Sequence, residues 1–195
     1  MSIKHPIISV TGSSVAGTST VKHTFQQIFR RESVKAVTLE GDAFHRYNRK
    51  EMKKELEKRH AAGDATFSHF SFDANLLPEL EDCFRNYSEQ GTCRYRHYIH
   101  NSSEENLYGA KPGNFTKWKK FEEPSDLLFY EGLHGAVINE EINLARYADL
   151  KIGVVPVINL EWIQKIHRDT DSRGYSTEAV TDTILRRMHA YVHCI

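Results

Sequence analysis

The chain has 195 residues, with 26 basic and 26 acidic side chains and three cysteines. This length fits one domain with elaborations, and an apolar fraction of 39% can build a core beneath a polar surface. The balanced charge argues against a general nucleic-acid binder, which would carry a net basic field. No stretch approaches the roughly 18 consecutive apolar residues of a membrane span, so we expect none.

The cysteines and the N-terminus favour a cytoplasmic protein. Cys83, Cys93 and Cys194 form an odd set without CxxC spacing, which predicts free thiols in a reducing compartment. The first residues of the chain lack the long apolar run of a signal peptide.

The N-terminal residues predict the opening of a parallel α/β unit. Residues 6–10 form a short β-branched run that indicates a buried strand. A loop of small residues, 12–17, precedes apolar residues at helical spacing, and Arg30 and Arg31 lie in the last turn of that predicted helix, where cations suit the helix dipole. A second strand is expected at 34–39.

The rest of the chain is less regular. Residues 49–60 predict a solvated helix, whereas 61–125 have weak periodicity and predict an irregular excursion over the strand ends, with one strand near 94–99. Buried strands are expected at 126–130 and 150–157. Asn159 and Ser176 are the expected N-caps of the last two helices. This order of elements predicts an α/β fold with a mostly parallel (mixed) sheet flanked by helices.

A phosphate-binding loop is predicted between the first strand and the first helix. Glycines allow backbone N–H groups to turn inward around phosphate oxygens, and the helix N-terminus adds its positive end; the alternative is an ordinary Gly/Ser turn. Thr18 stands where the phosphate-loop pattern expects Lys, while Ser19 would place a hydroxyl on Mg²⁺. The candidate nucleotide-binding residues are Gly12, Ser13, Ser14, Val15, Ala16, Gly17, Thr18, Ser19 and Thr20.

A phosphate loop without lysine needs a cation from elsewhere, because phosphoryl transfer develops charge that must be neutralised. Lys165 and Arg168 are three residues apart and would share one face of a helix. Arg173 follows in the same basic segment. A solvated helix face is the alternative interpretation.

Two acidic residues follow predicted strands. In an open parallel sheet, ligands gather at the carboxyl ends of the strands. Asp42 follows the second strand, where a carboxylate can accept the proton of a hydroxyl that attacks a γ-phosphoryl group; it can equally be a turn residue or a helix cap. Glu131 ends the strand at 126–130 and is a candidate for holding Mg²⁺ or its waters.

Basic side chains near Asp42 predict an anion site. His45, Arg49 and Lys53 are spaced four residues apart and line one face, which suits a phosphate on the substrate unless the face is merely solvated. Arg94, Arg96 and His100 would point to one side of a strand, either as a second anionic contact or as a charged edge.

Together these residues resemble bacterial phosphoribulokinase along nearly all of the chain. The matching stretches are 8–14 with 16–20, 40–46, 129–135 and 154–165. Thr18 in place of Lys is what this family has. The resemblance implies a P-loop NTP-hydrolase-like kinase fold in a single domain, 1–195, without the C-terminal part of the family. It also implies ATP- and Mg²⁺-dependent phosphorylation of the 1-hydroxyl of D-ribulose 5-phosphate, a step of the Calvin cycle of carbon fixation.

By residue, the resemblance implies that Asp42 is the general base and Asp169 a second catalytic carboxylate near Mg²⁺. It implies that Lys165 and Arg168 are the cations on the transferred phosphoryl group. It places Arg31 in allosteric control, with NADH as the activator. Val15 stands where the family usually has Gly, which would strain the loop if φ is positive there. The implied sugar-phosphate contacts are His45, Arg49, Lys53, His100 and Arg173.

Two alternatives remain. One is a uridine-kinase-like or pantothenate-kinase-like small-molecule kinase, because those families share the loop, an Asp after the second strand and an Arg-rich lid; residues 131–135 and 159–165 count against it. The other is a catalytically silent nucleotide-binding module. We expect a sugar-phosphate substrate and a homo-oligomer, with no nucleic-acid or membrane partner.

Overall fold

The structure is a computed structural model that describes residues 5–13, 16–64, 66–121, 124–155 and 157–193. Its central sheet has four parallel strands in the order β2 (Ala36–Glu40), β5 (Leu127–Gly132), β1 (Ile7–Gly12) and β6 (Leu150–Val154). A separate antiparallel pair joins β3 (Arg94–Tyr95) to β4 (Lys119–Lys120). The predicted fold class is therefore confirmed.

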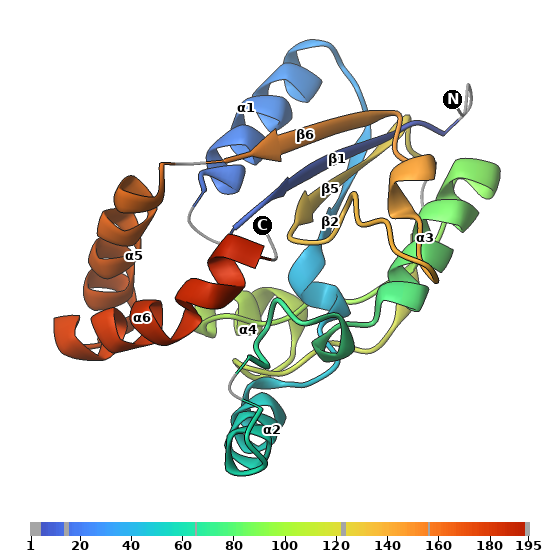
Figure 1. Cartoon of the computed structure of the whole chain (residues 1–195). Coiled ribbons are helices and arrows are strands. Elements are labelled where there is room, and N and C mark those ends of the chain that lie inside the picture. The colour runs from blue at the N-terminus through green and yellow to red at the C-terminus, as the bar shows by residue number, and fades with distance from the viewer. Residues whose placement is uncertain (1–4, 14–15, 65, 122–123, 156, 194–195) are drawn as a thin grey trace.

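Helices α1 (Thr18–Arg31) and α3 (Leu77–Gln90) cover opposite faces of the sheet (Figure 1). Successive side chains of a strand point to opposite faces, so each buried strand contributes to two cores. Leu128 and Tyr130 of β5 pack in the core on the α3 side, whereas Phe129 packs with Phe29 of α1. The sheet is thereby held between two layers of helix.

The remaining helices extend from the carboxyl-end edge of the sheet (Figure 1). Helices α5 and α6 pack against each other after β6. Short 3₁₀ turns lie in the connections between the longer helices and strands. The remaining helices are α2 (Arg49–Ala61), α4 (Ser102–Tyr108), α5 (Ile158–Arg173) and α6 (Thr177–His193), and the 3₁₀ turns are η1 (Gly41–Phe44), η2 (Phe72–Ala74) and η3 (Leu144–Arg146).

Helix boundaries follow local capping chemistry. Gly17 precedes α1 with φ 98°, a left-handed conformation that glycine adopts without steric cost. Asn48 caps α2 in a reciprocal arrangement with Glu51. The predicted cap of α6 is confirmed, because the Ala179 N–H donates to Ser176 Oγ at 3.2 Å. The predicted cap at Asn159 is wrong: α5 begins at Ile158, after an extended Val157.

The segment 61–125 is more regular than predicted. It contains α3, whose buried Leu77, Leu80, Phe84 and Tyr87 lie at helical spacing, and the short α4. The predicted strand at 94–99 is only two residues long, and β6 ends at Val154 rather than at residue 157. These apolar positions follow the 3.6-residue period of an amphipathic helix, a signal that the sequence analysis missed.

The prediction of free thiols is wrong for two of the three cysteines. Cys83 of α3 and Cys93 form a disulfide in the α3-side core, with their Cα atoms 4.8 Å apart. The chain brings them together because Gly91, which follows the last residue of α3 in a left-handed conformation, turns the chain back toward β3. Among the described residues, no helix is long and apolar enough to cross a membrane.

Candidate active site

The carboxyl ends of β1, β5 and β2 bring the phosphate loop, Glu131 and Asp42 to the same edge of the sheet. Glu131 lies in register with Glu40 of β2. Two glycines permit the close approach of the chain after these strands, because a Cβ on Gly132 would lie 2.7 Å from Gly41 Cα. Asp42 is thereby placed beside the end of β5.

The predicted phosphate loop has the expected strand–loop–helix setting. The Ala16 N–H donates to the Ser13 carbonyl at 3.0 Å, and Gly17 is the N-cap of α1. Gly12 has no room for a side chain, since a Cβ would lie 2.7 Å from the Val154 carbonyl. Ser19 and Thr20 are exposed in the first turn of α1. The predicted phosphate-loop residues Ser14 and Val15 lie outside the residues that the structure describes.

Thr18 turns into the site in place of the lysine that the general pattern expects. Its side chain is buried, and Oγ1 donates to Glu131 Oε1 at 2.5 Å. One turn later on α1, Lys22 Nζ lies 2.8 Å from Glu40 Oε1 and 3.8 Å from Glu131 Oε2. Burial lowers the pKa of Lys22, but the two glutamates outweigh it and the pKa is raised. Sequence reasoning missed Lys22, although its position four residues after Thr18 was the available signal.

Asp42 is the centre of a cluster of imidazoles. Its Oδ1 lies 3.2 Å from His45 Nε2, and its Oδ2 lies 3.4 Å from His100 Nε2. The Asp42 side chain is 45% exposed, so the carboxylate remains accessible to a substrate hydroxyl. The structure thus brings together three residues that the sequence analysis singled out from different motifs.

The neighbouring imidazoles determine the protonation states of the groups in this cluster. Desolvation raises the pKa of Asp42, but the hydrogen bond from His45 and the field of His45, His100 and His69 outweigh it and hold that pKa below its ordinary value. Burial lowers the pKa of His45, but Asp42 and Asn75 outweigh it and the pKa lies above its ordinary value. The resulting pair is a carboxylate beside an imidazolium, and Asp42 is ready to accept a proton.

Arg96 holds the turn that carries Asp42. Its Nε donates to the Ala43 carbonyl at 2.8 Å and its Nη2 to the His45 carbonyl at 2.7 Å. The guanidinium lies over the Phe115 ring at 3.6 Å, and burial lowers its pKa to about 10. Arg96 therefore stays charged at neutral pH and binds backbone, while Arg94 is exposed on β3. Arg96 therefore fits neither interpretation of the 94–100 segment, an anion contact or a charged edge strand.

A second charged cluster lies on α5. Asp169 Oδ2 is 3.0 Å from Lys165 Nζ, and Asp169 Oδ1 is 2.9 Å from Arg168 Nε. Burial raises the pKa of Asp169, but hydrogen bonds from Arg168 and Lys165 outweigh it and the pKa is lowered. Glu161, two turns before Asp169, accepts a hydrogen bond from Ser13 Oγ. This contact ties the charged face of α5 to the phosphate loop.

The other predicted residues are dispersed. Arg49 opens α2, and its Nη2 donates to the His100 carbonyl at 3.1 Å. Lys53 is exposed one turn further along α2. Arg31 pairs with Glu32 at the far end of α1, about 20 Å along the helix from the phosphate loop. The side chain of Arg173 lies outside the part of the chain that the structure describes.

Comparison with known proteins decides between the alternatives for the family. The model of the phosphoribulokinase/uridine kinase family matches residues 7–195. This chain belongs to that family. It is 72% identical over 195 residues to phosphoribulokinase 1 of Cereibacter sphaeroides and 63% identical over 192 residues to the phosphoribulokinase of Nitrobacter vulgaris. The predicted resemblance to bacterial phosphoribulokinase is confirmed.

Solved structures agree with this assignment. Phosphoribulokinase from Rhodobacter spheroides matches with a TM-score of 0.84 and 70% identity, covering 98% of this chain and 66% of that one. A possible uridine kinase from Bacillus stearothermophilus has a TM-score of 0.55 at 14% identity, covering 91% of this chain and 85% of that one, and shares the fold. The chain spans about two thirds of the length of the two curated relatives, 67% and 66%.

Kinases of this family use ATP with Mg²⁺, and the oxygen ligands at the strand ends suit that ion. Mg²⁺ is usually bound through one or two carboxylates, with waters and substrate phosphates completing its shell. Glu131, at the end of β5, offers a carboxylate and Ser19 an exposed hydroxyl, whereas the predicted ligand Asp169 lies on α5 with its carboxylate paired to Lys165 and Arg168. Among the described residues, no group of three or more His, Cys, Asp or Glu is placed to hold a metal ion.

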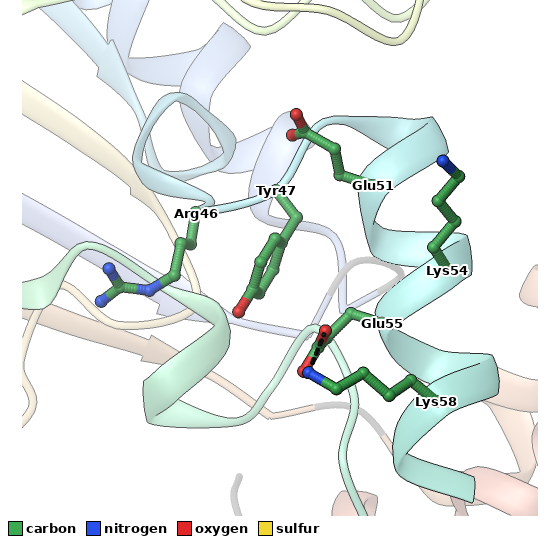
Figure 2. A pocket seen from close by; sticks show the side chains of 6 residues that line it. All are labelled: Arg46, Tyr47, Glu51, Lys54, Glu55 and Lys58. Carbon is green, nitrogen blue, oxygen red and sulfur yellow. Dashed lines mark hydrogen bonds and ion pairs between the residues drawn. The ribbon is translucent and has the colours of Figure 1, made fainter. Parts of the chain in front are cut away.

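A further hollow lies between α2 and the segment before it. Figure 2 shows its lining, which runs along α2 and the segment before it, with an ion pair of 3.4 Å between Lys58 and Glu55. The hollow contains none of the residues that the sequence analysis assigned to the site. It is lined by Arg46, Tyr47, Glu51, Lys54, Glu55 and Lys58.

Proposed function

We propose that this chain transfers the γ-phosphoryl group of ATP to the 1-hydroxyl of D-ribulose 5-phosphate, giving ribulose 1,5-bisphosphate and ADP. The observation that carries the proposal is the Asp42 carboxylate, held by His45 and His100 at the strand end next to the phosphate loop. The identity of 72% to phosphoribulokinase 1 of Cereibacter sphaeroides supports the choice of substrate. The reaction places the chain in the Calvin cycle.

Asp42 is the proposed general base. Its lowered pKa makes it a weak base, but little bonding to the nucleophile has formed in the loose transition state of phosphoryl transfer. Orientation of the attacking hydroxyl therefore matters more than base strength. The carboxylate accepts the hydroxyl proton as the new O–P bond forms and the bond to ADP breaks.

The cations of α5 are proposed to neutralise the transferred phosphoryl group. Lys165 and Arg168 are already oriented by Asp169, so little side-chain freedom is lost when the nucleotide binds. The phosphate loop binds ATP through backbone N–H groups and the N-terminus of α1. Mg²⁺, held by Glu131, Ser19 and Asp169, would add charge neutralisation on the phosphates.

The 5-phosphate of the sugar is proposed to bind at the start of α2. The imidazolium of His45 lies beside Asp42, and the guanidinium of Arg49 donates to the carbonyl of His100, whose ring also reaches Asp42. Lys53, exposed on α2, and Arg173 complete the proposed set. A planar guanidinium suits a phosphate because it donates two parallel hydrogen bonds.

The test is coupled ADP release with ribulose 5-phosphate, uridine and pantothenate as acceptors. We expect turnover with ribulose 5-phosphate alone. Turnover with uridine or pantothenate would support the related small-molecule kinases, and ATP binding without turnover on any acceptor would support a silent nucleotide-binding module.

Regulation and assembly are proposed from the family resemblance. NADH is the proposed activator, acting through Arg31, which lies exposed at the far end of α1. Addition of NADH to the ADP-release assay should raise the rate, and Arg31→Ala should reduce that response. We propose a homo-oligomer in the cytoplasm, and sedimentation of the purified chain tests the assembly.

A further inference from the structure

The His45 side chain has a second partner on the side away from Asp42. His45 Nδ1 lies 2.8 Å from Oδ1 of Asn75, a residue that the sequence analysis did not single out. Asn75 is only 3% exposed. Its position immediately before α3 is set by backbone pairing with the 44–46 segment, because the Arg46 N–H donates to the Ala74 carbonyl and the Leu76 N–H to the Phe44 carbonyl.

The orientation of the Asn75 amide follows from its other contacts. Its Nδ2 donates to the His69 carbonyl at 2.9 Å and to the Ser71 carbonyl at 2.8 Å. A carbonyl oxygen placed there would face two other oxygens, so the nitrogen must occupy this side. Oδ1 therefore faces His45, and because it can only accept a hydrogen bond, His45 Nδ1 must carry a proton.

His134 extends the same network and is also constrained. Its Nε2 lies 3.2 Å from Asn75 Nδ2, whose two hydrogens already go to the His69 and Ser71 carbonyls. His134 is 7% exposed, and burial together with the charge of His45 lowers its pKa to about 4. His134 is thus neutral and does not compete with His45 for positive charge.

We infer that Asn75 is a positioning residue that fixes the proton on His45 Nδ1 and so directs His45 Nε2 at Asp42. In the charged ring, Nδ1–H donates to Asn75 and Nε2–H donates to Asp42. The bond to Asp42 fixes one carboxylate oxygen and leaves the other for His100 and substrate. Asn75 acts through His45 and touches no reacting atom. The consequence for catalysis rests on the proposed function of Asp42 and His45.

Other groups around His45 must be included in any account of its titration. Asp42 favours the charged ring, and Arg96, bound to the His45 carbonyl, opposes it. The His69 ring centroid lies 5.3 Å from that of His45 and the Tyr98 ring at 6.2 Å. His100 reaches the same carboxylate, and His134 lies beyond Asn75. These groups are unchanged in variants of Asn75, so a difference between such variants reports on the amide alone.

The experiment is a titration of His45 by ¹⁵N NMR in the free 195-residue chain, with the signal assigned from its loss in His45→Gln. In the unmodified chain both ring nitrogens of His45 face atoms that only accept hydrogen bonds, so the doubly protonated imidazolium should persist above about pH 6.5, the ordinary histidine value. A neutral His45 with unprotonated Nδ1 at about pH 6.5 would overturn the inference without any variant of Asn75. Because no substrate is present, this result is independent of whether ribulose 5-phosphate is the acceptor.

Two variants of similar size then separate positioning from general damage. Asn75→Leu and Asn75→Asp both lose the donors to His69 and Ser71, so a merely structural role predicts the same effect for both. We expect Asn75→Leu to lower the pKa of His45 by about one unit, and Asn75→Asp to leave it at or above its value in the unmodified chain. The alkaline limb of kcat/KM should move in the same order. An unchanged His45 pKa in Asn75→Leu would overturn the inference.

Discussion

The two charged clusters of this protein are built in opposite ways. The Asp169 cluster lies within one helix, where Lys165 and Arg168 reach the carboxylate from four and one residues away. In the Asp42 cluster, His100 lies 58 residues after Asp42 in the sequence, and Asn75 lies 30 residues after its partner His45. One is set by helix geometry and the other by tertiary packing.

This difference predicts how the clusters respond to change. Regular helix geometry keeps the α5 side chains near one another wherever the helix forms. The Asp42 cluster needs β2, β5, the 75–76 segment and the 96–100 segment to be correctly packed at once. Damage to the core should therefore disturb Asp42 first, and the following measurements test that order.

Asp42→Asn should have the largest effect. Loss of the general base should lower kcat by about 10²- to 10⁴-fold while the KM for ATP changes little. ADP release measures the effect, and Asp82→Asn, which alters an exposed ion pair on α3, is the matched control. A loss of less than about tenfold would mean that Asp42 orients other groups rather than accepting a proton.

Lys165→Met should come next. Removal of a positioned cation should lower kcat by about 10²- to 10³-fold, with a much smaller change in the KM for ribulose 5-phosphate. Because the α5 cluster is local, the NMR signals of His45 should stay in place. Lys58→Met is the control, since that side chain is 75% exposed. An unchanged kcat would show that Lys165 only stabilises α5.

Gly135→Ala should damage the packing beneath the Asp42 cluster. A Cβ there would lie 2.1 Å from Ser9 Oγ and 2.4 Å from the Tyr130 ring, so we expect the free energy of unfolding to fall by about 1–3 kcal/mol. Chemical denaturation measures the loss. Gly153→Ala on β6, where a Cβ meets nothing within 4 Å, should change stability by less than about 0.5 kcal/mol. Equal losses would contradict the packing argument.

The smallest expected effect is a difference in pH dependence. His45 has a raised pKa in the folded chain, so the stability that it contributes with Asp42 is complete below about pH 6.5, the ordinary histidine value. It is lost as pH rises through the folded value. Asp169 has a lowered pKa, so its contribution is present above about pH 4 and is lost as pH falls through the folded value.

Unfolding of Asp42→Asn and Asp169→Asn at about pH 6 and pH 9 compares the two clusters. The stability lost in Asp42→Asn should shrink toward pH 9, by at most about 1 kcal/mol because 45% of the Asp42 side chain is exposed and screened. The loss in Asp169→Asn should stay constant, since the lowered pKa of Asp169 keeps its carboxylate ionised over this range. A constant difference for Asp42→Asn would show that His45 does not titrate against it.

Much of the fold and of the candidate site of this protein could be predicted from the sequence alone. The strand–loop–helix start, the parallel strands and the phosphate-loop setting could be predicted from strings of adjacent residues. The charged face of α5 was also predictable, because a spacing of three or four residues on a helix brings side chains together whatever the surroundings. The family motifs added Asp42, His45 and His100 as residues of one site.

Only the tertiary structure decided which atoms meet. That Thr18 turns to Glu131, that Arg96 binds the backbone of the Asp42 turn and that Asn75 faces His45 all depend on contacts between distant segments. The Cys83–Cys93 bond and α3 belong to the same class, because packing against the sheet completes them. Outside a regular helix or strand, the number of residues between two positions does not fix the distance between their side chains. These contacts therefore follow from how the helices and loops pack on the sheet.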